Sequence, residues 1–216
     1  MEINRRNFID MATKVLAGAA VFSLIPEIGE AAKKKTEETI ATPEFKMPSL
    51  KSFQALDNLS IGRINLDFTQ PMDIRAKTSA IVIHHAGMRR DEDLDVPSIH
   101  DIHLGNGWAG IGYHYIIHKD GFIEQGRPLK YVGAHAWKNN GYTVGICMTG
   151  NFDLGQPTFA QALATEQLVA ALCKKYKIKP TKKTIVGHRD LNDTSCPGGN
   201  FYPYLPKLIK NVKKVV

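Results

Sequence analysis

Two histidines and one cysteine have the types and spacing of a metal site. His84 follows directly after a short apolar run, where the end of a strand can present a side chain to a cleft. His188 and Cys196 lie eight residues apart, and a loop of that length, stiffened by Pro197 and Gly198, can bring both side chains to one point. Two imidazoles and one thiolate suit zinc, and three protein ligands leave the fourth tetrahedral position to water. Taken singly, each residue has an ordinary alternative as a packed or hydrogen-bonded core side chain.

Alternating segments are expected to position these residues. Strands are predicted over 79–83, 113–118, 121–124, 143–148 and 184–186, and helices over 96–105, 158–176 and 202–212. Lys119-Asp120-Gly121 separates two of the strands and predicts a hairpin turn. Strands and helices alternate loosely around this hairpin. The pattern predicts a single α/β domain with a central mixed β-sheet flanked by α-helices.

Composition narrows the class of protein. The chain has 216 residues, of which 43% are hydrophobic and 23% charged, so a disordered or collagen-like chain is excluded. Three cysteines are too few for a disulfide-stapled scaffold, so stability must come from a packed core. The net charge of +7 would suit nucleic acid, an anionic membrane or an anionic wall polymer. The positive charges do not form one basic block with interleaved aromatics, so we expect no nucleic-acid partner.

The N-terminal segment has the three regions of an export signal in order. Arg5-Arg6 begin a pattern similar to a twin-arginine signal, an apolar stretch follows over 12–25, and small residues precede a possible cleavage after Ala31. The apolar stretch is shorter than the roughly 20 residues that span a bilayer. We therefore expect residues 1–31 to direct export to the periplasm or cell envelope, with no stable membrane span after processing. A helix packed on the domain and an uncleaved anchor are the alternatives.

Residues 32–77 contain a lysine run, a Thr/Glu stretch and three prolines, which predict a linker followed by an N-terminal arm over the domain. No internal repeat is present in the sequence. The organised domain is therefore expected over residues 78–216. The protein is expected to be a monomer.

Ordered motifs fill this domain: Ile83-His84-His85-Ala86-Gly87, Gly112-Tyr113-His114-Tyr115, Glu124 with Gly126-Arg127, Val132-Gly133-Ala134-His135, Thr143-Val144-Gly145-Ile146-Cys147, Gly187-His188-Arg189-Asp190 and Cys196-Pro197-Gly198. Together they resemble the N-acetylmuramoyl-L-alanine amidases of the type-2 amidase and peptidoglycan-recognition-protein family, which includes the phage amidase-type lysozymes. The resemblance implies a zinc ion held by His84, His188 and Cys196. It also implies hydrolysis of the amide between the lactyl group of N-acetylmuramic acid and the L-alanine of the stem peptide, in peptidoglycan or a muropeptide.

The resemblance assigns further residues to the site. Tyr113 stands at the family tyrosine beside the metal, where its hydroxyl would bond the attacking water or the developing oxyanion. Thr194 lies two residues before the cysteine, where the phage enzymes have lysine, and it could orient water or carbonyl without carrying charge. His135 matches a groove histidine that would either give a proton to the leaving amine or hold substrate. Two other candidates come from residue type and not from the resemblance. Arg127 is either a carboxylate clamp for the stem peptide or a surface salt-bridge residue, and Trp137 is a candidate to line a sugar or peptide groove.

Other residues leave alternatives open. His100 and His103 are spaced i, i+3 on a predicted helix and could bind metal as a pair, but a surface or supporting role is favoured. Cys147 and Cys173 are expected as buried thiols, with a disulfide between them possible after export. The alternative function is a non-catalytic peptidoglycan-binding module, since family members that lose a metal ligand still bind muropeptides. The presence of Cys196 argues against that alternative.

Overall fold

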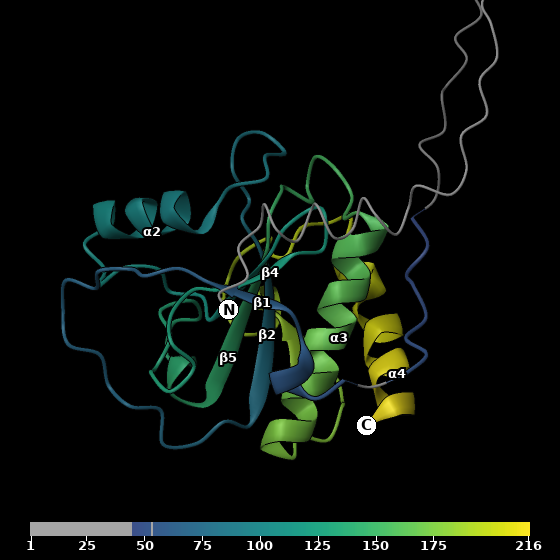
Figure 1. Ribbon diagram of the computed structural model, residues 1–216. Helices are drawn as coiled ribbons and strands as arrows, with labels where there is room; N and C mark the ends of the chain where they lie inside the picture. Colours follow the sequence, from purple (N-terminus) through teal and green to yellow (C-terminus); the bar gives the residue numbers. More distant parts are fainter. Residues whose placement is uncertain (1–44, 53) are drawn as a thin grey trace, which may run out of the picture.

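A computed structural model describes residues 45–52 and 54–216, so the predicted export signal lies outside the described residues (Figure 1). The strands are β1 (Ile61–Arg63), β2 (Ala80–His85), β3 (Tyr115–Ile117), β4 (Ile123–Gln125), β5 (Thr143–Met148) and β6 (Ile185–Gly187). The helices are α2 (Val96–Gly105), α3 (Phe159–Tyr176) and α4 (Leu205–Val215). Short 3₁₀ turns occupy Leu56–Asn58, Asn140–Tyr142, His188–Asp190 and Tyr202–Tyr204. The six strands form one mixed sheet in the order β1-β4-β3-β5-β2-β6, which confirms the predicted fold class.

Strand β2 lies inside the sheet, parallel to β5 on one side and to β6 on the other. All six of its residues are buried. Ile81 and Ile83 point into the larger core, which α3 and α4 cover. His84 is in register with Cys147, which belongs to the smaller core on the opposite face of the sheet. Because side chains alternate along a strand, the polar His84 stands on the α2 face at the end of an otherwise apolar strand.

Local residues set the helix boundaries. The Asp95 side chain accepts a hydrogen bond of 2.8 Å from the backbone nitrogen of Ser98 and caps α2. The Thr158 hydroxyl caps α3 in the same way, accepting from Gln161 at 3.0 Å. Side-chain oxygens at these positions satisfy backbone N–H groups that have no partner within the helix. Helix α3 ends where Lys177 adopts a left-handed conformation, with φ of 53°. Strand β5 and both of these helices lie where the sequence predicts them, within one residue.

The N-terminal arm is more than an extension over the surface. Residues 61–63 form β1, which pairs in parallel with β4 at one edge of the sheet, and Leu50 lies in the larger core. The sheet therefore begins before residue 78, earlier than the predicted domain boundary. A three-residue strand shows no usable periodicity, and Gly62 makes this one look like a loop. A Cβ atom at Gly62 would lie 2.5 Å from the Phe122 ring, so the close approach of β1 requires glycine.

Two further predictions need correction. Strand β3 begins at Tyr115, so Tyr113 lies on the preceding loop rather than in the strand. The predicted C-terminal helix is a 3₁₀ turn followed by α4.

The prediction of buried thiols is confirmed. Cys147 and Cys173 are free and lie in cores on opposite faces of the sheet, which excludes the alternative of a disulfide between them. In the part of the chain that the structure describes, no helix combines the length and the apolar character needed to cross a membrane.

A buried carboxyl lies between the two helices that cover the larger core. Glu166 of α3 is fully buried and accepts a 2.7 Å hydrogen bond from the Asn211 side chain of α4. Burial raises the pKa of Glu166 to about 7, and its hydrogen bond to Asn211 offsets only part of that rise. Because the folded pKa lies above the ordinary value of 4.5, folding retains the proton that unfolding releases. Stability from this group is therefore present at pH 4.5 and lost as the pH rises to about 7.

We expect Glu166→Gln to remove this pH dependence. Between pH 5 and pH 8 the wild-type free energy of unfolding should fall by on the order of 2 kcal/mol more than that of the variant, since one pKa unit corresponds to about 1.4 kcal/mol. Urea unfolding at both pH values measures the difference. Glu92→Gln, at an exposed position, serves as the control and should follow the wild type. Parallel pH profiles for wild type and Glu166→Gln would contradict the assignment.

Candidate metal centre and groove

The structure brings together the three residues predicted as ligands. His84, His188 and Cys196 each offer one ligand atom, and these atoms lie within 4.8 Å of one another. The Cys196 Sγ is 3.7 Å from His84 Nδ1, and the ring centroids of His84 and His188 are 4.6 Å apart. His84 and Cys196 are buried, whereas His188 is partly exposed. The cluster therefore opens to solvent on the His188 side.

Backbone hydrogen bonds close the loop that carries two of these residues. The Arg189 backbone nitrogen donates to the Cys196 carbonyl at 2.9 Å, and the Arg189 guanidinium donates to the carbonyl of Ser195. These bonds fold the eight-residue loop back on itself, so that Cys196 lies beside His188. The loop thus behaves as its spacing predicts, although arginine rather than Pro197 and Gly198 makes the bonds that cross it.

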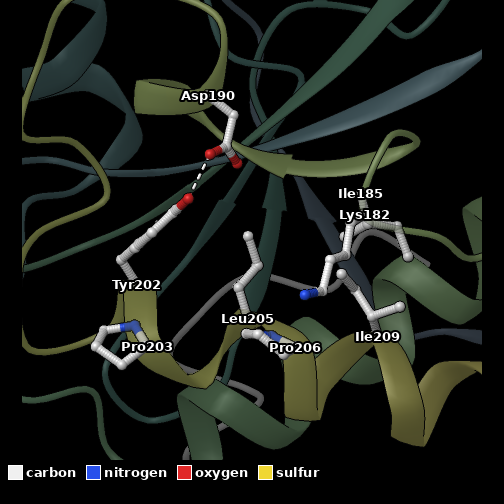
Figure 2. Close-up of a pocket in the computed structure, with 8 residues that line it drawn as sticks. All are labelled: Lys182, Ile185, Asp190, Tyr202, Pro203, Leu205, Pro206 and Ile209. Atoms are coloured by element: carbon white, nitrogen blue, oxygen red, sulfur yellow. Dashed lines mark hydrogen bonds between the residues drawn. The ribbon is translucent and has the colours of Figure 1, made fainter.

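The start of this loop is fixed from behind. Asp190 accepts from the Gly187 backbone nitrogen at 2.8 Å and also from the Tyr202 hydroxyl (Figure 2). The Arg189 guanidinium carbon lies 4.5 Å from the centroid of the Tyr202 ring. A cavity of about 300 Å³ opens beside Asp190 and Tyr202, against the mostly apolar start of α4. Its lining includes none of the three predicted ligands. Asp190 and Tyr202 therefore brace the metal loop from the side opposite the cluster.

The protonation states of the cluster fit a metal ion. Burial lowers the pKa of His84 well below its ordinary value and lowers that of His188, so both imidazoles are neutral and have a lone pair to offer. Burial raises the pKa of Cys196 to about 12, which leaves the thiol protonated when no cation faces it. A divalent cation would reverse that preference, because a coordinating thiol loses its proton. Two nitrogens and one sulfur at this separation are a donor set for zinc.

A hydrogen-bonded chain orients the ring of His84. His84 Nε2 lies 3.1 Å from His135 Nδ1, and His135 Nε2 lies 3.5 Å from the Thr143 hydroxyl. Thr143 donates its own proton to the Asn139 carbonyl at 2.7 Å, so its oxygen accepts from His135. His135 Nδ1 must then accept from His84 Nε2–H. This assignment leaves His84 Nδ1, the atom facing Cys196, free of a proton and able to bind a metal.

Two residues without an assigned role in the sequence hold His135 in place. A Cβ atom at Gly145 would lie 2.5 Å from the His135 ring, so the ring occupies space that only glycine leaves open. The Asn140 side chain accepts from the backbone nitrogens of His135 at 2.9 Å and Ala136 at 2.8 Å. Gly145 lies inside a motif that carries the family resemblance, which could have pointed to it. Nothing in the sequence marks Asn140.

Tyr113 lies against the cluster on the α2 face. Its ring centroid is 5.0 Å from that of His84 and 5.3 Å from that of His103. Burial raises the pKa of Tyr113 well above its usual value, with smaller contributions from Cys147 and Cys196. The phenol therefore stays protonated and can act only as a neutral hydrogen-bond donor or acceptor.

The helix histidines support the Tyr113 loop. His100 Nδ1 accepts from the Ile111 backbone nitrogen at 3.1 Å, and His103 Nδ1 accepts from that of Gly112 at 2.9 Å. Both rings are buried, so a surface role is wrong, and neither belongs to the three-residue cluster. They hold the backbone that leads into Tyr113, which agrees with the supporting role.

A groove of about 420 Å³ borders the cluster at His188, whereas His84, Cys196 and Tyr113 are not part of its lining. It is lined by Trp108, Ala134, His135, Ala136, Trp137, Asn140, His188, Asn192, Asp193 and Thr194. Trp137 is 73% exposed and Trp108 is 41% exposed, so both indoles offer free aromatic surface. The Asn192 side chain donates to the Trp137 carbonyl at 3.2 Å and ties the two rims together. Thr194 accepts from the Cys196 backbone nitrogen at 3.2 Å, which leaves its hydroxyl proton available to the groove.

Arg127 lies outside the lining of the groove. It is buried and donates to the carbonyls of Ile111 at 2.9 Å, Val132 at 2.9 Å and Gly110 at 3.3 Å. A surface salt bridge is therefore wrong, and Arg127 is absent from the lining of the groove. Three backbone carbonyls engage its guanidinium, so it fastens the loops under the groove and is not placed to clamp a substrate carboxylate.

Comparisons with known proteins agree with this geometry. Residues 75–199 match a family model described as N-acetylmuramoyl-L-alanine amidase. An endolysin of Klebsiella phage KP32 is 33% identical over 124 residues, which cover 57% of this chain and 82% of the endolysin. The amidase LysC from Clostridium intestinale has a TM-score of 0.64 at 35% identity, covering 72% of this chain and 98% of LysC. A variant of Drosophila PGRP-LB, solved in complex with tracheal cytotoxin, has a TM-score of 0.58 at 28% identity, covering 67% of this chain and 92% of that one.

The family model spans more than half of the chain, and its matched region contains all three residues of the cluster and the whole lining of the groove. The resemblance found in the sequence is thereby confirmed, and the chain belongs to the type-2 N-acetylmuramoyl-L-alanine amidase family, whose relatives include phage endolysins and peptidoglycan-recognition proteins.

Proposed function

We propose that this protein is a zinc-dependent amidase that cleaves the bond between the lactyl group of N-acetylmuramic acid and the L-alanine of the peptidoglycan stem peptide. The observation that carries the proposal is the complete His84, His188 and Cys196 cluster, which meets an open groove at His188. His84, His188 and Cys196 would hold the ion. When bound, zinc supplies Lewis-acid chemistry that activates water and polarises a carbonyl.

Tyr113 and Thr194 would hydrogen-bond to the attacking water and to the carbonyl oxygen of the substrate. Tyr113 is a neutral phenol beside His84, and it would donate to the carbonyl oxygen as negative charge develops there. Thr194 already accepts from the backbone of Cys196, so its hydroxyl can donate into the groove and orient water or carbonyl. Neither residue carries charge, which distinguishes this site from one with a lysine before the cysteine.

His135 is a positioning residue in this proposal, not a proton donor to the leaving amine. Its Nδ1 accepts from His84 and its Nε2 is directed at Thr143, so both ring nitrogens are engaged. Burial also lowers the pKa of His135 well below its usual value, which leaves the ring neutral and a weak acid. Its effect on substrate would come through the orientation of His84 and through its share of the groove wall.

The groove offers recognition for a sugar or a stem peptide. Trp108 and Trp137 present exposed indole faces of the kind that bind apolar faces of such ligands. The PGRP-LB complex with tracheal cytotoxin shows a relative holding a ligand. A non-catalytic binding module would also use such a groove, but it would not need the intact ligand set. We further propose export to the periplasm or cell envelope, on the basis of the twin-arginine-like pattern at Arg5-Arg6, and a protein that acts as a monomer.

The first test measures zinc content and amide hydrolysis together. The full chain, incubated with a defined muropeptide, should release free stem peptide, lose this activity with a chelator and regain it with zinc. Cys196→Ser should lose most of both zinc and activity, since a neutral hydroxyl is a poor ligand. Cys173→Ala, a buried cysteine on the other face of the sheet, is the matched control. Intact muropeptide in the presence of stoichiometric zinc would favour the binding module instead.

Replacing Tyr113 separates metal binding from turnover. Tyr113→Phe should keep zinc and lose on the order of 100-fold in kcat, because one well-placed donor to a developing oxyanion is worth about 3 kcal/mol. Mass spectrometry of released stem peptide gives the rate. Tyr131→Phe is the control, because the Tyr131 ring faces Lys130, whereas the Tyr113 ring contacts His84. An unchanged kcat in Tyr113→Phe would mean that the tyrosine serves only in packing.

The role of His135 is tested by zinc affinity rather than by rate. His135→Ala should weaken zinc binding by roughly 10- to 100-fold, the usual effect of removing a hydrogen-bond partner from a metal-bound histidine. His135→Asn should recover part of this affinity, because its side-chain oxygen can accept from His84 Nε2–H. Competition with a chelator measures affinity, and the absorption spectrum of the cobalt-substituted protein reports the geometry. Wild-type zinc affinity in His135→Ala would refute the positioning role.

A further inference from the structure

Positive charge is concentrated in the last fifth of the chain. Residues 174–216 contain 11 Lys and Arg against 2 Asp and Glu, whereas residues 1–173 contain 17 against 19. The C-terminal segment therefore carries +9 and the rest of the chain −2. Along the sequence these lysines form short runs separated by apolar residues, and only folding shows whether they share a surface.

The fold gathers eight of these lysines at one end of the molecule, called here the basic end. It consists of Lys174 and Lys175 in the last turn of α3, Lys177, Lys179, Lys182 and Lys183 in the connection to β6, and Lys213 and Lys214 in the last turn of α4. All eight are exposed. Helices α3 and α4 pack side by side and finish at the same end, where the C-terminus of the chain lies (Figure 1). The sequence contains no basic block with interleaved aromatics, and the basic end is a different feature: lysines from separate segments that folding brings to one end.

The basic end lies opposite the groove. Strand β6 runs parallel to β2, and the lysine-rich connection leads into the first residue of β6. This connection is therefore at the N-terminal edge of these strands. His84 stands near the C-terminal end of β2, and His188 directly follows the last residue of β6. The sheet thus separates the lysines from the metal cluster along the strand direction.

A contribution to helix stability accounts for only four of the eight lysines in the basic end. Lysines in the last turns of α3 and α4 complement the partial negative charge of the helix C-termini. The four lysines of the connection follow the last turn of α3. Lys182 lines the cavity that also holds Asp190, but among the described residues none of the four forms an ion pair with an acidic side chain. Like charges at this density repel one another, and an anionic partner would relieve that repulsion.

We propose that the basic end docks the protein on an anionic phospholipid surface. Its charges are all lysines, which act as mobile point charges suited to diffuse headgroup charge and lack the planar fork with which arginine binds one phosphate. Among the described residues, the exposed large apolar side chains all lie outside 174–216, so no aromatic platform for single-stranded nucleic acid accompanies the lysines. A surface bound at this end leaves the groove facing away from the bilayer. This inference is independent of the amidase proposal.

Co-sedimentation with vesicles tests the docking surface directly. The full chain should bind vesicles that contain about one third phosphatidylglycerol, and not pure phosphatidylcholine vesicles. Binding should fall steeply between 0.05 and 0.5 M NaCl, since salt screens charges beyond roughly 4 Å at the higher concentration. The quadruple variant Lys175→Gln/Lys179→Gln/Lys183→Gln/Lys213→Gln should bind at least 100-fold more weakly, given the contribution of each lysine near such a surface.

The matched control removes the same charge elsewhere. Lys46→Gln/Arg89→Gln/Arg90→Gln/Lys207→Gln changes four exposed residues outside the basic end and should retain most of the binding. Equal losses in both quadruple variants would show that net charge, not the basic end, governs binding, and would overturn the proposal. Tighter binding to soluble polyglycerol phosphate or to DNA than to the vesicles would also overturn it, in favour of a polymer ligand. Circular dichroism of both variants checks that each is folded.

Discussion

The position of His84 at the end of β2 is the constraint on which the site depends. Strand β2 is held between β5 and β6, and every one of its side chains is buried, so its end cannot move without disturbing both cores. A histidine placed there is fixed in the backbone before any ligand binds. His188 follows β6, the neighbouring strand, and therefore emerges at the same edge of the sheet. Parallel pairing thus brings two ligands from distant parts of the sequence together, and only Cys196 needs a loop to reach them.

Histidine does much of the internal bonding in this fold. Seven of the eight histidines are buried, and most of these do not belong to the metal cluster. Nδ1 accepts from a backbone N–H group in four of them: His85, His100, His103 and His114. A buried N–H without a partner costs free energy, and a neutral imidazole supplies an acceptor where a loop cannot join a strand ladder. The mild excess of histidine is thus mainly structural, and the sequence cannot separate these residues from ligands by type alone.

The predictable part of the protein is the part governed by local pattern. Helices α2 and α3 have side-chain caps at Asp95 and Thr158, and β5 is a continuous apolar run, so their boundaries can be seen in the sequence. Strand ends and loop length mark His84, His188 and Cys196 as candidate ligands, but the choice of these three over a core role comes from the family resemblance. By contrast, β1 depends on pairing with β4, a strand about sixty residues away, and its three residues carry no pattern of their own. Contacts of that kind are decided by the whole fold.

The same limit explains why roles are harder to predict than membership of the site. Arg127 and His135 both belong to motifs that resemble the family, yet their functions follow from what each nitrogen meets. The Arg127 guanidinium donates to backbone carbonyls and lies outside the lining of the groove. His135 accepts a hydrogen bond from His84 and donates one to Thr143. The His135 arrangement requires the space left by the missing side chain of Gly145, so a glycine determines the orientation of a candidate metal ligand, His84. Because that dependence runs through shape rather than residue chemistry, only the folded structure shows it.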